Sequence, residues 1–349
     1  MGLHAFVKVI TNLWGTPLTS GGVLRLYIRE MTYKNPEWSY SAVLYELNVR
    51  QLTPEGTFAA AMERLPFLRS IGIDAIWLMP IYPIGIEGRK GSLGSYYSIR
   101  DYKGINEEFG TAEEFRNFVE CAHALGLKVI LDWVANHTAR DARWIEERPA
   151  DWYERDENGV AKVPWDWTDT AKLNYANHDV WRGQIDAMRY WVENFDVDGF
   201  RCDMAMLVPI EFWQEASEEL HRIKSDIFML AEAEEDNLFD NAFNMSYQWN
   251  VHHIMVDIAK GARRVWDLRN AIHSERARYP REAMRMSFTS NHDENSWSGS
   301  EQSRFGAALE VMTAMTFLMP STMPLIYTGQ EVGYDHSFEF FERDAIPEE

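Results

Sequence analysis

The feature that most constrains the fold is a regular alternation of short apolar runs with amphipathic, helix-like stretches along the chain. Eight of the runs read as strands, because each is short, apolar and followed by polar or turn-forming residues. They begin at residues 41, 73, 127, 197, 227, 243, 284 and 323. Strands that alternate with helices form a parallel sheet, since each helix returns the chain to the start of the next strand.

The intervening stretches carry helix signals. Thr111 is a predicted N-cap with Glu114 three residues later, and Gly126 is the predicted stop. Further helical patterns cover residues 180–195 and 209–223. Eight strands in roughly 300 residues favour a closed barrel over an open doubly wound sheet. No G-x-G-x-x-G follows an early strand, which counts against dinucleotide binding. The predicted fold class is therefore α/β, a (β/α)8 TIM barrel.

Two segments interrupt this alternation and set the predicted domain boundaries. Residues 1–40 precede the first clear strand and form an N-terminal extension. Residues 139–179 are rich in tryptophan and acidic residues and form a short inserted domain after the third strand. The barrel then comprises residues 41–138 and 180–349. An insertion between a strand and its helix lies at the C-terminal face of a barrel, where active sites are found.

Charge and cysteine usage exclude several classes of partner. The formal net charge is −20, which repels phosphate backbones and anionic lipid surfaces, so we expect no nucleic-acid partner and no membrane association. The opening residues MGLHAFVKVITNLWG contain no continuous apolar core and no small-residue cleavage site, which predicts no secretion signal. Cys121 and Cys202 are the only cysteines and provide no disulfide framework, so the sequence favours a cytoplasmic location.

Several predicted strands end in polar residues, and in a parallel barrel all these ends meet on one rim. A single residue of this kind could be an ordinary helix N-cap. Several partly desolvated carboxylates close together destabilise the folded protein. A catalytic role is one reason for a protein to retain them. The polar residues at the ends of the third, fourth, fifth and seventh strands include Asp132, His137, Arg201, Asp203, Glu232, Glu234, His292 and Asp293.

Paired carboxylates are the groups that retaining glycoside hydrolysis requires, one as nucleophile and one as general acid. Asp203 suits the nucleophile, because Arg201 lies two residues earlier on the same strand face and would hold it ionised. Glu232 suits the acid, with a pKa raised by its apolar surroundings. Strand alternation places Glu234 on the same face as Glu232, so the residues alone leave that choice open.

The same strand ends resemble the signature regions of the α-amylase superfamily, the family 13 glycoside hydrolases. The segments that carry the resemblance are DWVANH, GFRCDMA, LAEAE and FTSNHD, together with GSYYSIRDYKGINEEFGT and PLIYTGQE, and they occur in the family's order. The resemblance implies a barrel with a small domain after the third strand. It also implies retaining cleavage of α-glucosidic bonds in maltooligosaccharides or starch-like glucans.

The resemblance further implies a role for each matching residue. It picks Glu232 as general acid/base over Glu234, assigns Asp203 as nucleophile, and gives Asp293 the role of stabilising the distorted, oxocarbenium-like sugar. It implies that four residues bind or orient: Tyr97 stacks under the sugar, His137 and His292 hydrogen-bond it, and Arg201 orients the nucleophile.

Two departures from the family pattern are informative. Family α-amylases often carry Lys-His shortly after the nucleophile, where this chain has Met206 and Leu207, so we expect a more apolar acceptor side. Members with structural calcium use the asparagine that corresponds to Asn136 and an aspartate whose place is taken here by Lys172. A lysine cannot ligate calcium, so we expect no metal and no other cofactor.

Alternatives remain open at this stage. The substrate could instead be an α-1,6-linked glucoside, sucrose or trehalose, with hydrolysis or transglycosylation as the outcome. A non-catalytic carbohydrate-binding barrel is the alternative from another class, although such barrels lose the three carboxylates that are present here. Loop shapes around Tyr82, Trp152, Trp165 and Trp167 decide how many sugars bind, and the three tryptophans could be sugar platforms or merely the core of the small domain.

Overall fold

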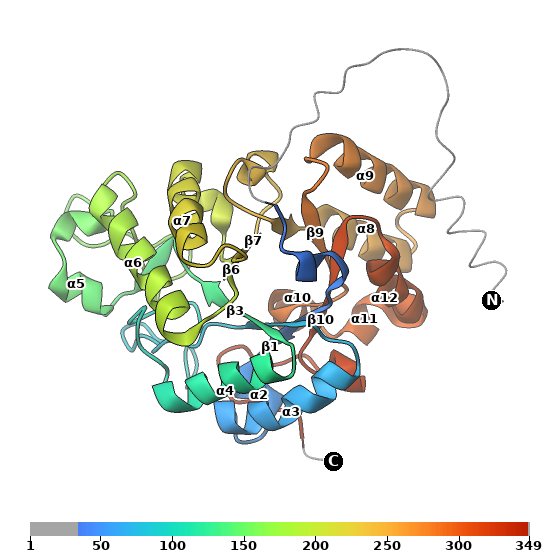
Figure 1. Ribbon diagram of the computed structural model, residues 1–349, viewed down its shortest axis with the longest axis horizontal. Coiled ribbons are helices and arrows are strands. Elements are labelled where there is room, and N and C mark those ends of the chain that lie inside the picture. The colour runs from blue at the N-terminus through green and yellow to red at the C-terminus, as the bar shows by residue number, and fades with distance from the viewer. Residues whose placement is uncertain (1–33, 348–349) are drawn as a thin grey trace, which may run out of the picture.

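The structure is a computed structural model that describes residues 34–347, so most of the predicted N-terminal extension, residues 1–40, lies outside the described residues. Within that range, eight strands close into a parallel barrel in the order β1-β10-β9-β8-β7-β6-β3-β2 (Figure 1). The predicted fold class is confirmed, and each of the eight predicted runs overlaps one barrel strand. The strands are β1 (Leu44–Leu47), β2 (Ala75–Leu78), β3 (Lys128–Trp133), β6 (Gly199–Cys202), β7 (Phe228–Ala231), β8 (Met245–Tyr247), β9 (Met284–Ser287) and β10 (Thr322–Tyr327).

Helices surround the barrel on its outer side (Figure 1). Thr111 caps α4 as predicted: its hydroxyl accepts from the Glu114 N–H, and the Glu114 carboxylate accepts from the Thr111 N–H. In the described part of the chain, no helix is both long enough and apolar enough to span a bilayer. The α-helices are α2 (Val49–Leu52), α3 (Phe58–Ser70), α4 (Ala112–Ala124), α5 (Arg143–Glu147), α6 (His178–Phe195), α7 (Ile210–Ile223), α8 (Trp249–Ala259), α9 (Val265–Arg278), α10 (His292–Ser298), α11 (Glu301–Phe305) and α12 (Leu309–Leu318).

The strands are buried on both faces, and alternate residues enter different cores. On β1, Leu44 lies in the cluster that fills the barrel interior, whereas Tyr45 belongs to the cluster that includes residues of the surrounding helices. The interior cluster contains Trp77, Ile130, Leu230, Met245, Tyr247, Met286 and Leu325, among others. This packed interior leaves the rim as the place for a site.

The register of neighbouring strands places the polar residues at their ends at the same height along the barrel axis. Asp132 of β3 pairs with Arg201 of β6, and Cys202 of β6 pairs with Ala231 of β7. The residues that follow these strands, Asp203 and Glu232, therefore leave the barrel side by side at its C-terminal rim.

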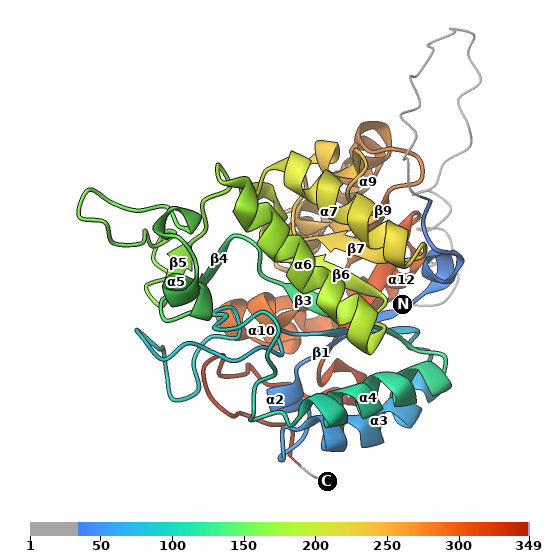
Figure 2. The same ribbon diagram turned by 60° about the vertical axis from the view of Figure 1, so that its left-hand side comes forward.

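The inserted segment forms a small unit of its own at one side of the barrel (Figure 2). Its strands β4 (His137–Ala139) and β5 (Thr170–Lys172) pair antiparallel. Trp152, Tyr153 and Leu173 form part of a second apolar core beneath them. The sequence pattern extends the third strand through His137, whereas β3 ends at Trp133, so His137 opens the hairpin of the insertion instead.

Candidate active site

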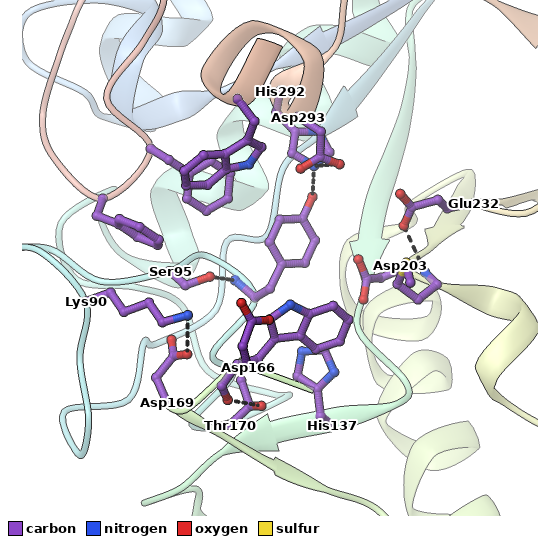
Figure 3. Close-up of a pocket in the computed structure, with 16 residues that line it drawn as sticks. Lys90, Ser95, His137, Asp166, Asp169, Thr170, Asp203, Glu232, His292 and Asp293 are labelled. Atoms are coloured by element: carbon purple, nitrogen blue, oxygen red, sulfur yellow. Dashed lines mark hydrogen bonds and ion pairs between the residues drawn. The ribbon is translucent and has the colours of Figure 1, made fainter. Parts of the chain in front are cut away.

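A cavity of about 430 Å³ lies at the C-terminal rim of the barrel (Figure 3). This volume is within the range of small-molecule sites. One predicted site residue, Arg201, is fully buried and is not part of the cavity lining. The other six predicted site residues line it: Tyr97, His137, Asp203, Glu232, His292 and Asp293.

Arg201 connects three buried carboxylates. Its Nη1 lies 3.1 Å from Asp132 Oδ1 and 3.2 Å from Asp203 Oδ1, and its Nη2 lies 2.7 Å from Glu232 Oε2. Its Nε donates to the hydroxyl of Tyr247 at 3.1 Å. Because the guanidinium is planar and its donors are fixed, these contacts hold Asp203 and Glu232 as close neighbours.

The electrostatics of Asp203 differ from the sequence-based expectation of a carboxylate that its arginine keeps ionised. Burial and the adjacent Glu232 raise the pKa of Asp203 well above its ordinary value, although Arg201 opposes the shift. The arginine cannot serve Asp203 alone, since it also faces Asp132 and Glu232. Asp203 therefore retains its proton at a higher pH than an isolated aspartate would.

Glu232 receives a further hydrogen bond from the backbone. The N–H of Met204 donates to Glu232 Oε2 at 2.9 Å. Met204 has φ 41° and ψ 47°, a left-handed conformation that is costly for a side chain of this type. This conformation, directly after Asp203, turns the Met204 N–H toward Glu232.

Glu232 and Glu234 are distinguished by their positions. Glu232 lines the cavity, while Glu234 Oε1 lies 3.1 Å from Arg285 Nη2 and accepts from the Asn250 N–H at 3.1 Å. Beyond Ala231 the chain leaves β7, so the alternation that puts the two glutamates on one face no longer applies. Only Glu232 is placed next to Asp203.

The two cavity histidines are in opposite electrostatic settings. Burial lowers the pKa of His137 to about 4, so its ring is neutral near pH 7. Burial opposes the charged form of His292 as well, but Asp293 and Glu46 outweigh it and raise the pKa of His292 well above the ordinary value. The same His292 lowers the pKa of Asp293, against the effect of burial.

Tyr97 joins this group from the loop after β2. Its hydroxyl lies 2.8 Å from His292 Nε2 and donates to Asp132 Oδ2 at 3.1 Å. Its ring stacks on that of His292, with the centroids 5.4 Å apart and the planes at 25°. The stack leaves Tyr97 on the cavity wall, where a sugar ring could pack against it.

The aromatic residues near the rim differ in whether they belong to a core or face the cavity. Tyr82 and Trp152 are buried in aromatic or apolar clusters and are core residues. Trp167 lines the cavity and packs against His137 at 5.1 Å, and Trp165, 63% exposed, packs against Trp167 at 4.9 Å. Trp167 is therefore placed to contact a ligand, whereas Trp165 packs on it without lining the cavity.

The residues at the family's calcium position do not fit that ion. Lys172 Nζ lies 2.8 Å from Glu154 Oε1, so an ammonium group stands where an acidic ligand would be required. The Asn136 side chain donates to His137 Nδ1 at 3.2 Å, an interaction that orients the ring. Among residues 34–347, no group of three or more His, Cys, Asp or Glu side chains could hold a metal ion.

Sequence reasoning missed several residues of the site. Glu46 of β1 is fully buried and hydrogen-bonds His292 Nδ1, and Tyr247 of β8 binds Arg201. A lone acid inside the apolar run SAVLYELNV is a signal that could have identified Glu46. The cavity residues Trp297 and Phe340 follow β9 and β10 at a distance, and no local pattern marks them.

Comparisons with known proteins agree with this arrangement. The family model described as "Alpha amylase, catalytic domain" matches residues 32–171 and 152–347. An alpha-amylase of Haloarcula japonica is 31% identical over 316 residues, which cover 86% of this chain and 45% of that protein. The chain thus spans about half the length of this curated relative.

Solved structures show the same likeness. The crystal structure of an alpha-amylase from Lactobacillus plantarum has a TM-score of 0.83 and 34% identity, and the match covers 88% of this chain and 76% of that one. A noncanonic maltogenic alpha-amylase from Thermotoga neapolitana has a TM-score of 0.80 and 34% identity, over 88% and 72%. With its closed barrel and its rim of buried carboxylates, the chain belongs to the alpha-amylase catalytic-domain family.

Proposed function

We propose that this protein is a retaining glycoside hydrolase that cleaves α-1,4-glucosidic bonds in maltooligosaccharides or starch-like glucans. One observation carries the proposal: a single guanidinium, that of Arg201, contacts both Asp203 and Glu232. Retaining enzymes keep the two carboxyl groups about 5–5.5 Å apart, whereas inverting enzymes need about 6.5–9.5 Å to admit a water. Two carboxyl groups that contact one guanidinium lie close together, which favours the shorter carboxyl–carboxyl separation of a retaining enzyme.

In the first step, Asp203 attacks the anomeric carbon while Glu232 gives its proton to the departing glycosidic oxygen. A covalent glycosyl-enzyme forms, and the aglycone leaves with a free hydroxyl group. In the second step, Glu232 takes a proton from water, and the resulting hydroxide displaces Asp203. Asp203 must be ionised to attack, and Arg201 is the group that favours its charged form, against burial and the neighbouring Glu232.

The remaining site residues support the oxocarbenium-like transition state. The carboxylate of Asp293, kept ionised by His292, supplies negative charge to the sugar. Tyr97 offers a ring face to the pyranose, and the neutral His137 offers a hydrogen bond to a hydroxyl group.

The charge of the cavity favours a neutral sugar. Its lining carries five carboxylates, those of Asp166, Asp169, Asp203, Glu232 and Asp293. Its lysine, Lys90, is already paired with Asp169, at 3.5 Å. A phosphorylated sugar would be repelled, so we infer that unmodified α-glucans are the substrate class.

Maltoheptaose hydrolysis followed by proton NMR tests the proposed reaction. We expect the newly formed reducing end to appear first as the α-anomer, because two displacements at one carbon retain its configuration. Isomaltose, sucrose and trehalose, assayed in parallel, should be cleaved far more slowly. Initial release of the β-anomer would contradict the retaining mechanism, and preferred cleavage of another disaccharide would contradict the linkage.

We further propose that the enzyme needs no calcium, since Lys172 and Glu154 already pair where an ion would be held. Dialysis against a chelator is expected to leave both the rate on maltoheptaose and the melting temperature unchanged. A parallel sample with added calcium provides the control. A large loss of rate or stability that calcium restores would show that another ligand set exists.

A further inference from the structure

The cavity has a wall opposite its catalytic carboxylates. Figure 3 shows Lys90 and Asp169 on the far side of the cavity from Asp203 and Glu232. Lys90 comes from the loop after β2, and Asp169 comes from the insertion. Their ion pair, 3.5 Å between Nζ and Oδ1, joins these two parts of the chain across one end of the cavity.

The loop that carries Lys90 is clamped on both sides. A Cβ at Gly88 would lie 3.2 Å from the Thr168 backbone oxygen, so the loop touches the insertion there. A Cβ at Gly91 would lie 2.5 Å from that of Phe341, so the loop also touches the segment after β10. Both glycines have positive φ, which side-chain-bearing residues rarely adopt.

Hydrogen bonds fasten this second contact. The N–H of Leu93 donates to the Phe341 carbonyl at 3.0 Å, and the N–H of Ser92 donates to Glu342 Oε1 at 2.8 Å. The loop is thus fixed to the insertion by an ion pair and to the segment after β10 by backbone and side-chain bonds. Such a loop has little freedom to move aside for a ligand.

Aromatic side chains continue the same wall. Phe340 stacks on Tyr97 with centroids 6.3 Å apart and planes at 14°, and Trp297 packs on Phe340 at 5.4 Å and on Phe341 at 5.8 Å. All of them line the cavity. We call the set of Lys90, Asp169, Trp297, Phe340 and Phe341 the closing wall.

The proposed reaction indicates which part of the substrate faces the closing wall. The general acid lies beside the leaving oxygen, so the aglycone extends on the side of Glu232. On this side the chain continues from the cavity residue Met204 to Met206, whose side chain is 41% exposed. Figure 3 shows Lys90 and Asp169 on the opposite side of the cavity from the two carboxylates. We infer that the sugar that becomes attached to Asp203 extends toward them. The closing wall therefore limits the glycone, the part that carries the non-reducing end.

We propose that the closing wall makes this enzyme exo-acting: it admits only the non-reducing end of a glucan and releases short products. This inference rests on the proposed function and specifies which bond of the chain is cut. An endo-acting enzyme needs a cleft that is open at both ends, so that internal sugars can pass through. Here the glycone end is crossed by an ion pair and lined by three packed aromatic rings.

A pair of matched substrates tests the proposal: a nitrophenyl maltoheptaoside and the same compound with its non-reducing end blocked by a 4,6-acetal. Because the block cannot enter a closed glycone end, we expect at least about 100-fold slower cleavage of the blocked compound. Equal rates on both would overturn the exo proposal while leaving the proposed hydrolysis intact. No cleavage of either would instead contradict the proposed function.

A double variant provides the second arm. Lys90→Ala with Phe341→Ala removes the ion pair and one ring, and is expected to raise the blocked-to-free rate ratio by about tenfold or more. Lys103→Ala is the matched control, since Lys103 pairs with Asp186 on the surface at 2.6 Å and does not line the cavity. The melting temperature of each variant shows that it is folded. An unchanged ratio in a folded double variant would overturn the assignment of the limit to the closing wall.

Discussion

Replacement of Asp203 by asparagine is expected to abolish turnover and, at neutral pH, to raise the melting temperature. Turnover ends because the amide cannot form the glycosyl-enzyme, and loss of a covalent nucleophile lowers kcat by at least about 10³-fold. Stability rises because Asp203 is a buried carboxyl whose pKa is well above its ordinary value, so its ionised form destabilises the folded state. Maltoheptaose assays and thermal unfolding measure the two effects.

The stability gain of Asp203→Asn over the wild type should increase as the pH rises. Below the pKa of the unfolded carboxyl, about 3.9, both proteins are neutral at this position and should melt alike. As pH rises from there to the raised folded-state pKa, the unfolded wild-type chain loses its proton more readily than the folded one. Wild-type stability therefore falls relative to Asp203→Asn, and the difference levels off above the folded-state pKa.

A matched variant separates catalysis from cavity charge. Asp166 also lines the cavity but is exposed, so Asp166→Asn should keep most of the activity and show no comparable pH-dependent stabilisation. Full turnover by Asp203→Asn would contradict the nucleophile assignment. A melting temperature that falls at neutral pH would show that the contact with Arg201 outweighs burial.

Replacement of Glu232 by glutamine is expected to be nearly as damaging on natural substrates, for a different reason. The amide cannot protonate the departing oxygen, and general acid catalysis contributes about 10²–10⁴-fold. An α-glucosyl fluoride needs no such proton, so its first step should survive in Glu232→Gln. The glycosyl-enzyme would then accumulate, because no base activates water.

Azide provides a sharp readout for this variant. As an anion it attacks the glycosyl-enzyme without a base, displaces Asp203 and yields an α-glucosyl azide. Glu234→Gln is the matched control, since Glu234 pairs with Arg285 outside the cavity, and it should hydrolyse maltoheptaose at a near wild-type rate. If Glu234→Gln lost activity and was rescued by azide while Glu232→Gln stayed active, Glu234 and not Glu232 would be the general acid/base.

The fold could be predicted from sequence because its signals are local. Each barrel strand is a short apolar run, and the alternation with helices leaves few arrangements. The proximity of Arg201 and Asp203 follows from the period of two in a strand, and Asp132 joins them once the strands are parallel and in register. Apart from His137, which opens the insertion hairpin, the strand-end positions at the rim follow from these rules, whereas Tyr97 and the choice of Glu232 over Glu234 rested on the family resemblance.

The rest of the site depends on contacts between distant segments. Glu234 leaves the cavity because the chain turns after β7, and no periodicity describes a turn. Lys90 meets Asp169 across 79 residues of sequence, and Phe340 meets Tyr97 across a greater distance. Such pairs are set by how loops pack on one another, so the closing wall is visible only in three dimensions.

The bonds of Arg201 also have a consequence for how the barrel assembles. Its partners Asp132 and Tyr247 lie on β3 and β8, and Asp203 and Glu232 directly follow β6 and β7, so the bonds join residues 132–247. A partly assembled barrel would bury some of these charges without their counter-charges, which is strongly unfavourable. Intermediates that lack one of these strands are therefore penalised. The bonds of Arg201 thereby couple β3, β6, β7 and β8 into one cooperative folding unit.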